Sequence, residues 1–286
     1  MFHDRLGCSS ISFRHLPFDE ALGTIAGLGF EEIDLGALPG VCDHVPFELT
    51  DADIRDVAAR VAGSGLRVRS VNGDVGDLNA ALDGDRLAQR AAHLDRLLLL
   101  ARTVGARALV LPCGALSPEP VRSVGEDIDL VARQLAVAGE RAAAFGVELW
   151  TESLHYYRLC GTLDRAAALA DRLEGTRVRH VLDLSHVVAS GSTPQDAITA
   201  LASSNGRGPG DAGGGRIAHV HLRDAVPGNI NLSIDNGSVD FAGALTALRN
   251  AGFDGHYSLE LEAHDLTHDE RPAAAAKAAS FITDLI

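Results

Sequence analysis

Three carboxylates and one imidazole follow four short apolar runs in the second half of the chain, at the points where the runs end. Side chains of these types suit a hard or borderline divalent cation with octahedral geometry and open positions for substrate oxygens. We therefore predict one divalent metal ion: manganese first, with magnesium, cobalt or zinc as alternatives. Zinc is less favoured because no thiolate ligand is present. The predicted ligands are Glu152, Asp183, His221 and Glu260.

The spacing of these four residues fits a protein in which they lie on neighbouring strands. They are separated by 31, 38 and 39 residues, and each interval is about one strand-helix-strand repeat of this chain. In an α/β barrel the catalytic groups sit at the carboxyl ends of the strands, so four such ends can bring these side chains to one rim. A helix cap at Asp183 or a lumen histidine at His221 explains a single residue but not all four.

Short β-rich runs alternate with longer helical patterns along the chain, which is typical of parallel βαβ units. Eight alternations in 286 residues predict an α/β fold, a single (β/α)8 TIM barrel over residues 1–286, because closure pairs both sheet edges. A doubly wound open sheet is the alternative, but its Gly-x-Gly-x-x-Gly turn and the Walker-type loop are both missing. The expected strands are residues 6–13, 31–35, 66–71, 108–111, 147–151, 178–184, 217–222 and 256–261.

Composition excludes several classes of protein. Lys and Arg number 25 against 39 Asp and Glu, and the net charge of −14 repels a nucleic-acid backbone. No apolar run approaches 18 residues, and the opening residues do not resemble a signal peptide, so we expect a cytoplasmic protein that spans no membrane. The four cysteines are interpreted as reduced structural thiols. The Ser-, Gly- and Pro-rich residues 203–215 are expected to form a flexible connection without a functional role.

Four short segments around the predicted ligands carry a resemblance to a known family. They are Glu152, Asp183-Leu184-Ser185-His186, His219-Val220-His221-Leu222-Arg223-Asp224, and Gly252-Phe253-Asp254-Gly255 leading to Glu260. In order and spacing they resemble the sugar (phosphate) isomerase/epimerase family of xylose isomerase-like barrels. The resemblance covers nearly the whole chain.

The resemblance implies that the four predicted ligands hold one divalent metal ion and that His186 contacts the substrate. It also implies that Glu152 and Glu260 exchange protons with a substrate carbon. A metal that chelates the carbonyl and hydroxyl oxygens of a ketose acidifies the neighbouring C–H and stabilises the enediolate, while a carboxylate takes the proton. The expected activity is that of a sugar isomerase or epimerase acting on a ketose or related polyol-ketone.

One position departs from the ketose 3-epimerases, which carry a further glutamate six residues beyond the strand-five ligand. This chain has Arg158 there. We therefore expect a different substrate pocket, in which His155 and Arg158 bind a carboxylate, a phosphate or a sugar hydroxyl, since arginine suits planar anions. Asn72 and Arg223 are the other predicted substrate-binding residues. The long polar loop of residues 226–239 is expected to lie over this pocket.

Other polar or aromatic side chains have simpler interpretations. His219 points the same way as His221 but lies deeper, so we expect a hydrogen-bonded lumen histidine rather than a second ligand. Trp150 is expected to pack inside the barrel, and His93 to lie exposed on a helix.

Three alternative functions remain open from the sequence. A lyase of the inosose dehydratase or C-glycoside deglycosidase type would use the same metal and enediolate. An enzyme of the endonuclease IV type shares the barrel but needs three metals, further histidines after strands three and four, and a basic rim. A non-catalytic sugar-binding barrel would not require the complete ligand set. We expect a small carbohydrate as the partner, and a homodimer is an option for which the sequence identifies no interface.

Overall fold

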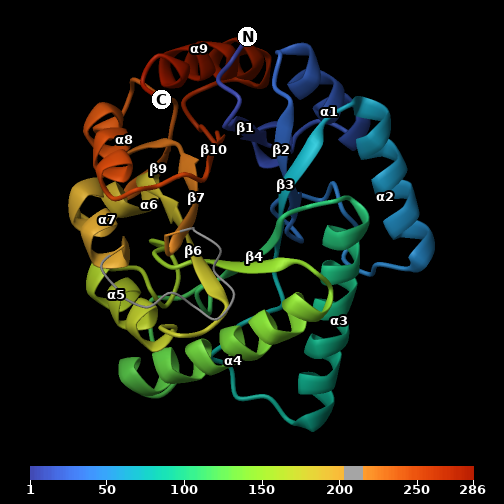
Figure 1. The fold of residues 1–286 in the computed structure, drawn as a ribbon, viewed down its shortest axis with the longest axis vertical. Helices are drawn as coiled ribbons and strands as arrows, with labels where there is room; N and C mark the ends of the chain where they lie inside the picture. Colours follow the sequence, from blue (N-terminus) through green and yellow to red (C-terminus); the bar gives the residue numbers. More distant parts are fainter. Residues whose placement is uncertain (203–214) are drawn as a thin grey trace.

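Eight parallel strands close into a barrel in the order β1-β10-β7-β6-β5-β4-β3-β2 (Figure 1). The structure is a computed structural model that describes residues 1–202 and 215–286, so the predicted flexible connection lies, except for Gly215, outside the described residues. The barrel confirms the predicted fold. Its strands are β1 (Leu6–Ser9), β2 (Glu32–Ala37), β3 (Arg67–Gly73), β4 (Ala108–Pro112), β5 (Glu148–Glu152), β6 (Val178–Asp183), β7 (Ile217–Leu222) and β10 (His256–Leu259).

Helices surround the barrel (Figure 1), and several of them begin at polar caps. Thr50 and Asp53 form a capping box at the start of α2, and Ser123 and Glu126 form another at the start of α4. Gly65, with φ of 77°, ends α2 in a left-handed conformation that favours glycine. The helices that follow the barrel strands are α1 (Phe18–Gly27), α2 (Asp51–Ser64), α3 (Gly84–Thr103), α4 (Val124–Ala144), α5 (Leu163–Arg172), α7 (Pro194–Ala202), α8 (Phe241–Asn250) and α9 (Arg271–Thr283).

Five short elements were not predicted. The first expected strand ends early, because the side chain of Ser9 caps a 3-10 helix, η1 (Ser10–Phe13). The helix α6 (Leu184–Ala189) follows β6 directly, because Asp183 accepts hydrogen bonds from the backbone N–H groups that open it. A hairpin of β8 (Asp224–Val226) and β9 (Asn229–Leu232) lies in the predicted polar loop, and a 3-10 helix, η2 (His268–Glu270), precedes α9.

Two separate apolar clusters pack the described part of the fold. The larger one lies between the sheet and the helices, and the smaller one comprises Ala108, Val110, Trp150, Val181 and Ala218 from four adjacent strands. Trp150 is 1% exposed and belongs to the smaller cluster, which confirms its predicted packing role. All four cysteines are buried free thiols, as expected. None of the helices in the described ranges is long and apolar enough to cross a membrane.

Candidate metal centre at the mouth of the barrel

The four predicted ligands come from the ends of four consecutive barrel strands. Glu152 and Asp183 end β5 and β6, His221 is the penultimate residue of β7, and Glu260 directly follows β10. Ligand atoms of Glu152, Asp183 and His221 all lie within 4.8 Å of one another. Glu260 joins them through His221, with its Oε2 2.6 Å from His221 Nδ1. The structure therefore brings the predicted quartet together at one side of the mouth.

Asp183 is both a helix cap and a member of this cluster. Its Oδ1 accepts hydrogen bonds from the backbone N–H and the hydroxyl of Ser185, at 2.7 and 2.6 Å. Its Oδ2 lies 3.0 Å from a guanidinium nitrogen of Arg223, and both side chains are buried. These contacts fix the carboxylate at the end of β6. The cap and the predicted ligand are thus one side chain in two roles.

The carboxylates of the cluster repel one another. Burial raises the pKa of Glu152 well above its usual value, and the negative charges of Asp183 and Glu260 raise it further. A buried group of this kind gains from a cation, which removes the repulsion that otherwise favours the protonated acid. The charge balance of the site therefore fits a divalent metal ion.

His221 is 2% exposed, and neither of its ring nitrogens makes a hydrogen bond within the described residues. Glu260 Oε2 is near Nδ1, but the contact lacks the direction of a hydrogen bond. Burial alone would lower the pKa of His221, yet the carboxylates of Glu260 and Asp34 hold it well above its usual value. Such a buried, unpartnered nitrogen beside carboxylates is the environment that a metal ligand requires.

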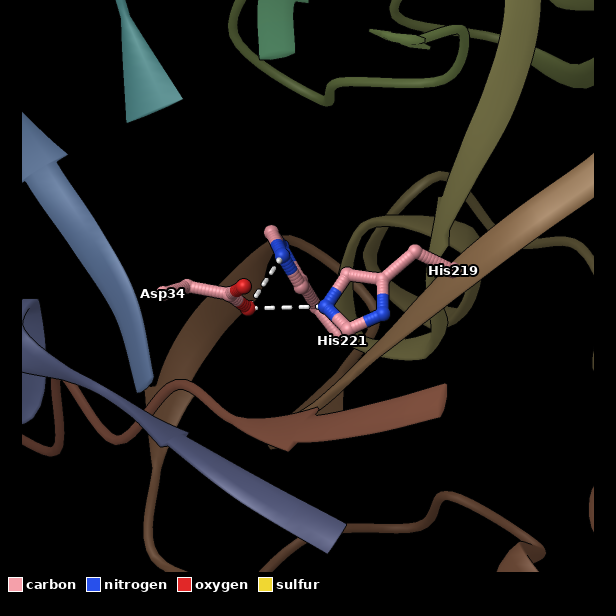
Figure 2. Close-up of side chains that lie close together, drawn as sticks. All are labelled: Asp34, His219 and His221. Carbon is pink, nitrogen blue, oxygen red and sulfur yellow. Dashed lines mark hydrogen bonds and ion pairs between the residues drawn. The ribbon is translucent and has the colours of Figure 1, made fainter. Parts of the chain in front are cut away.

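Asp34 is a residue of this region that the sequence analysis missed. It lies on β2, and its Oδ2 is 2.7 Å from His219 Nε2 and 3.5 Å from His221 Nε2. Figure 2 shows both imidazole rings directed toward this one carboxylate. Ser70 donates a hydrogen bond to the other oxygen, Oδ1, at 2.7 Å. An acidic residue in the middle of a buried strand is the signal that could have identified it.

His219 has the role expected of a lumen histidine. It is 1% exposed, hydrogen-bonded to Asp34, and stacked on Trp150 with ring centroids 5.5 Å apart. Asp34, His219 and His221 also form a group with ligand atoms within 4.8 Å of one another. Because Asp34 and His219 are already hydrogen-bonded to each other, we interpret this pair as a support for the ring of His221.

His186 lies on α6 beside the carboxylates. The backbone N–H of Tyr156 donates to its Nδ1 at 3.0 Å, so the proton of the neutral ring must be on Nε2. Nε2 faces Glu152 Oε1 at 3.5 Å, and it also lies 3.3 Å from a guanidinium nitrogen of Arg223, which can only donate and therefore makes no hydrogen bond with a protonated Nε2. Burial and the positive charge of Arg223 keep the pKa of His186 well below its usual value. His186 is therefore a neutral hydrogen-bond donor that points into the site.

His155 stacks on His186, with ring centroids 3.9 Å apart. Its Nδ1 is buried without a hydrogen-bond partner in the described residues. Burial, with the neighbouring His186 and Arg158, holds the pKa of His155 well below its usual value. The site thus contains two neutral imidazoles side by side.

The other predicted substrate residues line the same cavity, which has a volume of about 1260 Å³. Arg158 donates to Asp74 Oδ2 at 3.0 Å and to the carbonyl of Gly114 at 2.9 Å. Arg223 donates to Ser185, Asp183 and Glu262. Both guanidinium groups are therefore already engaged by the protein. Asn72 also lines the cavity, and its Oδ1 accepts a hydrogen bond from Ser70.

Two further expectations concern the cavity wall. Ile230 and Asn231 of β9 line the cavity, so part of the predicted loop does border it. Asp224 holds this loop in place by accepting hydrogen bonds from the backbone N–H groups of Asp235, Gly237 and Val239. The expectation for His93 was wrong. It is half-buried and lines the cavity, because its Nε2 bonds the carbonyl of Asp74 and its ring packs on Phe47.

Comparisons with known proteins agree with this architecture. The family described as xylose isomerase-like TIM barrel matches residues 22–285. No curated protein matches the chain.

Three solved structures show the same fold at low sequence identity. The 3-keto-D-glucoside 4-epimerase from E. coli has 20% identity and a TM-score of 0.73, over 99% of both chains. D-psicose 3-epimerase from Clostridium cellulolyticum H10, solved with D-tagatose, has 15% identity and a TM-score of 0.75, over 98% of this chain and 99% of its own. The IOLI protein, solved with a binding zinc atom, has 19% identity and a TM-score of 0.73, over 99% of both chains.

Proposed function

Because the chain belongs to the family of xylose isomerase-like TIM barrels, we propose that it is a divalent-metal-dependent sugar isomerase or epimerase of the cytoplasm. Its substrate would be a ketose or related polyol-ketone, converted through an enediolate. The observation that carries the proposal is the convergence of Glu152, Asp183 and His221, with Glu260 against His221, beside one large cavity.

The donor set supports a metal cofactor held by these four residues. Three carboxylates with one imidazole favour manganese, with magnesium, cobalt or zinc as alternatives. The raised pKa of Glu152 and the unpartnered nitrogens of His221 support a cation at this place. When bound, the metal would polarise the carbonyl and hydroxyl oxygens of the substrate and stabilise the negative charge that develops on them.

Residues of the chain would carry out the proton transfers and orient the substrate. Glu152 and Glu260 would take and return protons at carbon. Transfer by two carboxylates from opposite faces gives epimerisation, whereas return by one carboxylate to the adjacent carbon gives isomerisation. His186, with its proton held on Nε2, would donate a hydrogen bond to a substrate oxygen.

A metal-dependent lyase is the second candidate, and the unpartnered nitrogen of His155 favours it. Loss of a β-hydroxyl or an aglycone from the same enediolate places negative charge on the leaving oxygen, which a hydrogen-bond donor stabilises. His155, whose Nδ1 is buried without a partner in the described residues, would donate a hydrogen bond from its neutral ring to that oxygen. An endonuclease IV type of site is less well supported, because Asn72 and Cys113 occupy the ends of β3 and β4, where histidines are needed.

The test is proton exchange in deuterated water with the metal-free and the manganese-loaded protein. The substrates are ketoses, inososes and 3-keto-glycosides. Deuterium at carbon with the skeleton retained, only in the loaded protein, supports the isomerase or epimerase, whereas loss of water or aglycone supports the lyase. Removal of the metal by a chelator should also lower the Tm, since a ligand at 100 times its Kd contributes about 2.7 kcal/mol. Exchange that proceeds equally without metal would refute the proposal.

A further inference from the structure

The cavity extends well beyond the candidate metal centre. The predicted ligands lie at the carboxyl ends of β5, β6, β7 and β10, but much of the cavity wall comes from the segments that follow β2, β3 and β4. Its volume of about 1260 Å³ exceeds the range of about 300–1,000 Å³ that is usual for a drug-sized ligand. A single sugar ring is smaller than such a ligand. A sugar bound at the metal centre would therefore leave the opposite part of the cavity empty.

Apolar side chains gather in that opposite part, which we call the outer sector. It is bordered by Val41 and Phe47 after β2 and by Leu116 after β4. Phe47 is 55% exposed and Leu116 is 65% exposed. Large apolar side chains left exposed together mark binding surfaces more often than single ones do. Charged side chains, among them Glu48, Arg90 and Arg96, also line these segments, and the apolar faces lie among them.

Phe47 has a defined position in the outer sector. Its ring lies against the ring of His93, with centroids 4.5 Å apart, and His93 Nε2 bonds the carbonyl of Asp74. A ring supported in this way loses little conformational freedom when another flat group stacks on it. Near the metal centre, Arg158 and Arg223 already donate to protein acceptors, which leaves fewer of their N–H groups for a phosphate.

We propose that the outer sector binds an apolar, flat substituent of the substrate, so that the natural substrate is a keto-sugar glycoside with an aromatic aglycone rather than a free sugar. The inference rests on the proposed function, which places the keto-sugar at the metal centre. Phe47 and Leu116 would contact the aglycone and determine specificity without touching the reacting carbons.

The test compares methyl and phenyl glycosides of 3-keto-D-glucose as substrates of the manganese-loaded protein, with deuterium exchange at carbon as the readout. The phenyl compound should have the higher kcat/KM, by about 10-fold or more, because an aromatic ring is buried. Phe47→Ala and Leu116→Ser should each remove most of this preference and leave the methyl compound within about twofold of wild type. Phe47→Tyr should restore the preference.

A matched control is available on the outer surface. Val137 on α4 is 66% exposed, nearly the same as Leu116, and does not line the cavity. Val137→Ser should leave both substrates unchanged. A phenyl preference that survives Phe47→Ala, or equal turnover of the two compounds by wild type, would overturn the inference while the proposed reaction stands.

A binding measurement separates the inference from the reaction. Calorimetric titration with the unoxidised phenyl and methyl β-D-glucosides needs no turnover. Phenyl-selective binding that is lost in Phe47→Ala, without exchange on any keto-sugar, would support the outer sector and refute the proposed reaction. A second copy of this chain is the other molecule that the outer sector would bind, and sedimentation of wild type and Phe47→Ala tests it. A dimer that the substitution dissociates would assign these side chains to a subunit contact and overturn the inference.

Discussion

Asp34 and His219 are joined across the barrel by a hydrogen bond of 2.7 Å, although 185 residues separate them in the sequence. The same carboxylate lies 3.5 Å from Nε2 of His221, whose other ring nitrogen faces Glu260. A carboxylate behind a metal-ligating histidine fixes the ring orientation and its tautomer. The pair therefore links the interior of the barrel to the candidate metal centre.

Replacement of Asp34 by Asn should weaken metal binding. The amide keeps the volume but loses the negative charge that lies 3.5 Å from Nε2 of His221, so the imidazole becomes a less basic ligand, and we expect a loss of about 10–100-fold in affinity. Calorimetric titration of both proteins with Mn²⁺ measures this affinity. Ser70→Ala, which removes the hydrogen bonds to Asp34 Oδ1 and Asn72 Oδ1 but keeps the charge of Asp34, should have a smaller effect. Equal affinity in Asp34→Asn and wild type would exclude this supporting role.

Replacement of Glu260 by Gln should lower the rate of deuterium exchange by about 10²–10⁴-fold, because a ligand charge and a proton acceptor are lost together. The control is Glu262→Gln, two residues further on, whose carboxylate pairs with Arg223 and Arg14 instead of His221. It should retain most of the activity. An unchanged rate in Glu260→Gln would remove this residue from the mechanism.

Two substitutions of His186 distinguish a hydrogen-bond donor from a packing residue. Gln can still donate from its side-chain amide, whereas Phe fills the space without a donor. We expect His186→Phe to reduce kcat by about 10²-fold and His186→Gln to retain more of it, since one lost transition-state hydrogen bond has roughly this effect. Circular dichroism and the Tm check that both variants fold. If the Phe variant matched the Gln variant, the donor role would be wrong.

His180 predicts how stability depends on pH. It is fully buried beside Ser153, and burial, followed by the charges of Arg216 and Arg179, lowers its pKa to about 3. The unfolded chain therefore binds the proton first, so this contribution to stability is complete above the unfolded pKa of 6.5 and is lost as the pH falls through it. Each pH unit below that value costs about 1.4 kcal/mol.

Urea unfolding at pH 7.0 and 5.5 measures this effect. His180→Gln should show a smaller decrease in the free energy of unfolding between the two values than wild type does. Ser153→Ala keeps the imidazole and should keep the wild-type decrease. If wild type and His180→Gln lost the same free energy, the acid sensitivity would have to arise elsewhere, for example at His155 or His186, whose pKa values are also lowered by burial.

The barrel and the order of the predicted ligands could be derived from the sequence because both depend on local patterns. A polar side chain at the end of an apolar run is visible without knowledge of the partner strands, as at Glu152 and Asp183. Asp34 was missed because its partner, His219, lies on a distant strand, and only closure of the barrel brings the two together.

Other misses have similar physical causes. His93 lies on a helix with a polar pattern, yet Phe47 from a different loop covers its ring. The β8–β9 hairpin depends on Asp224, which holds three backbone N–H groups up to 15 residues away. The pairing of Arg158 with Asp74 joins two loops separated by 84 residues, so its engagement could not be foreseen from the sequence.

The double duty of Asp183 has a consequence for attempts to redesign this protein. The carboxylate that would bind the ion also caps the N-terminus of α6, the short helix that carries His186. A substitution at this position would weaken metal binding and also disturb the orientation of the His186 imidazole. An excess of metal salt could restore metal occupancy but not the orientation of the ring. The contacts described for Asp183 do not include the loops after β2 and β4, so new specificities are more safely sought in those loops.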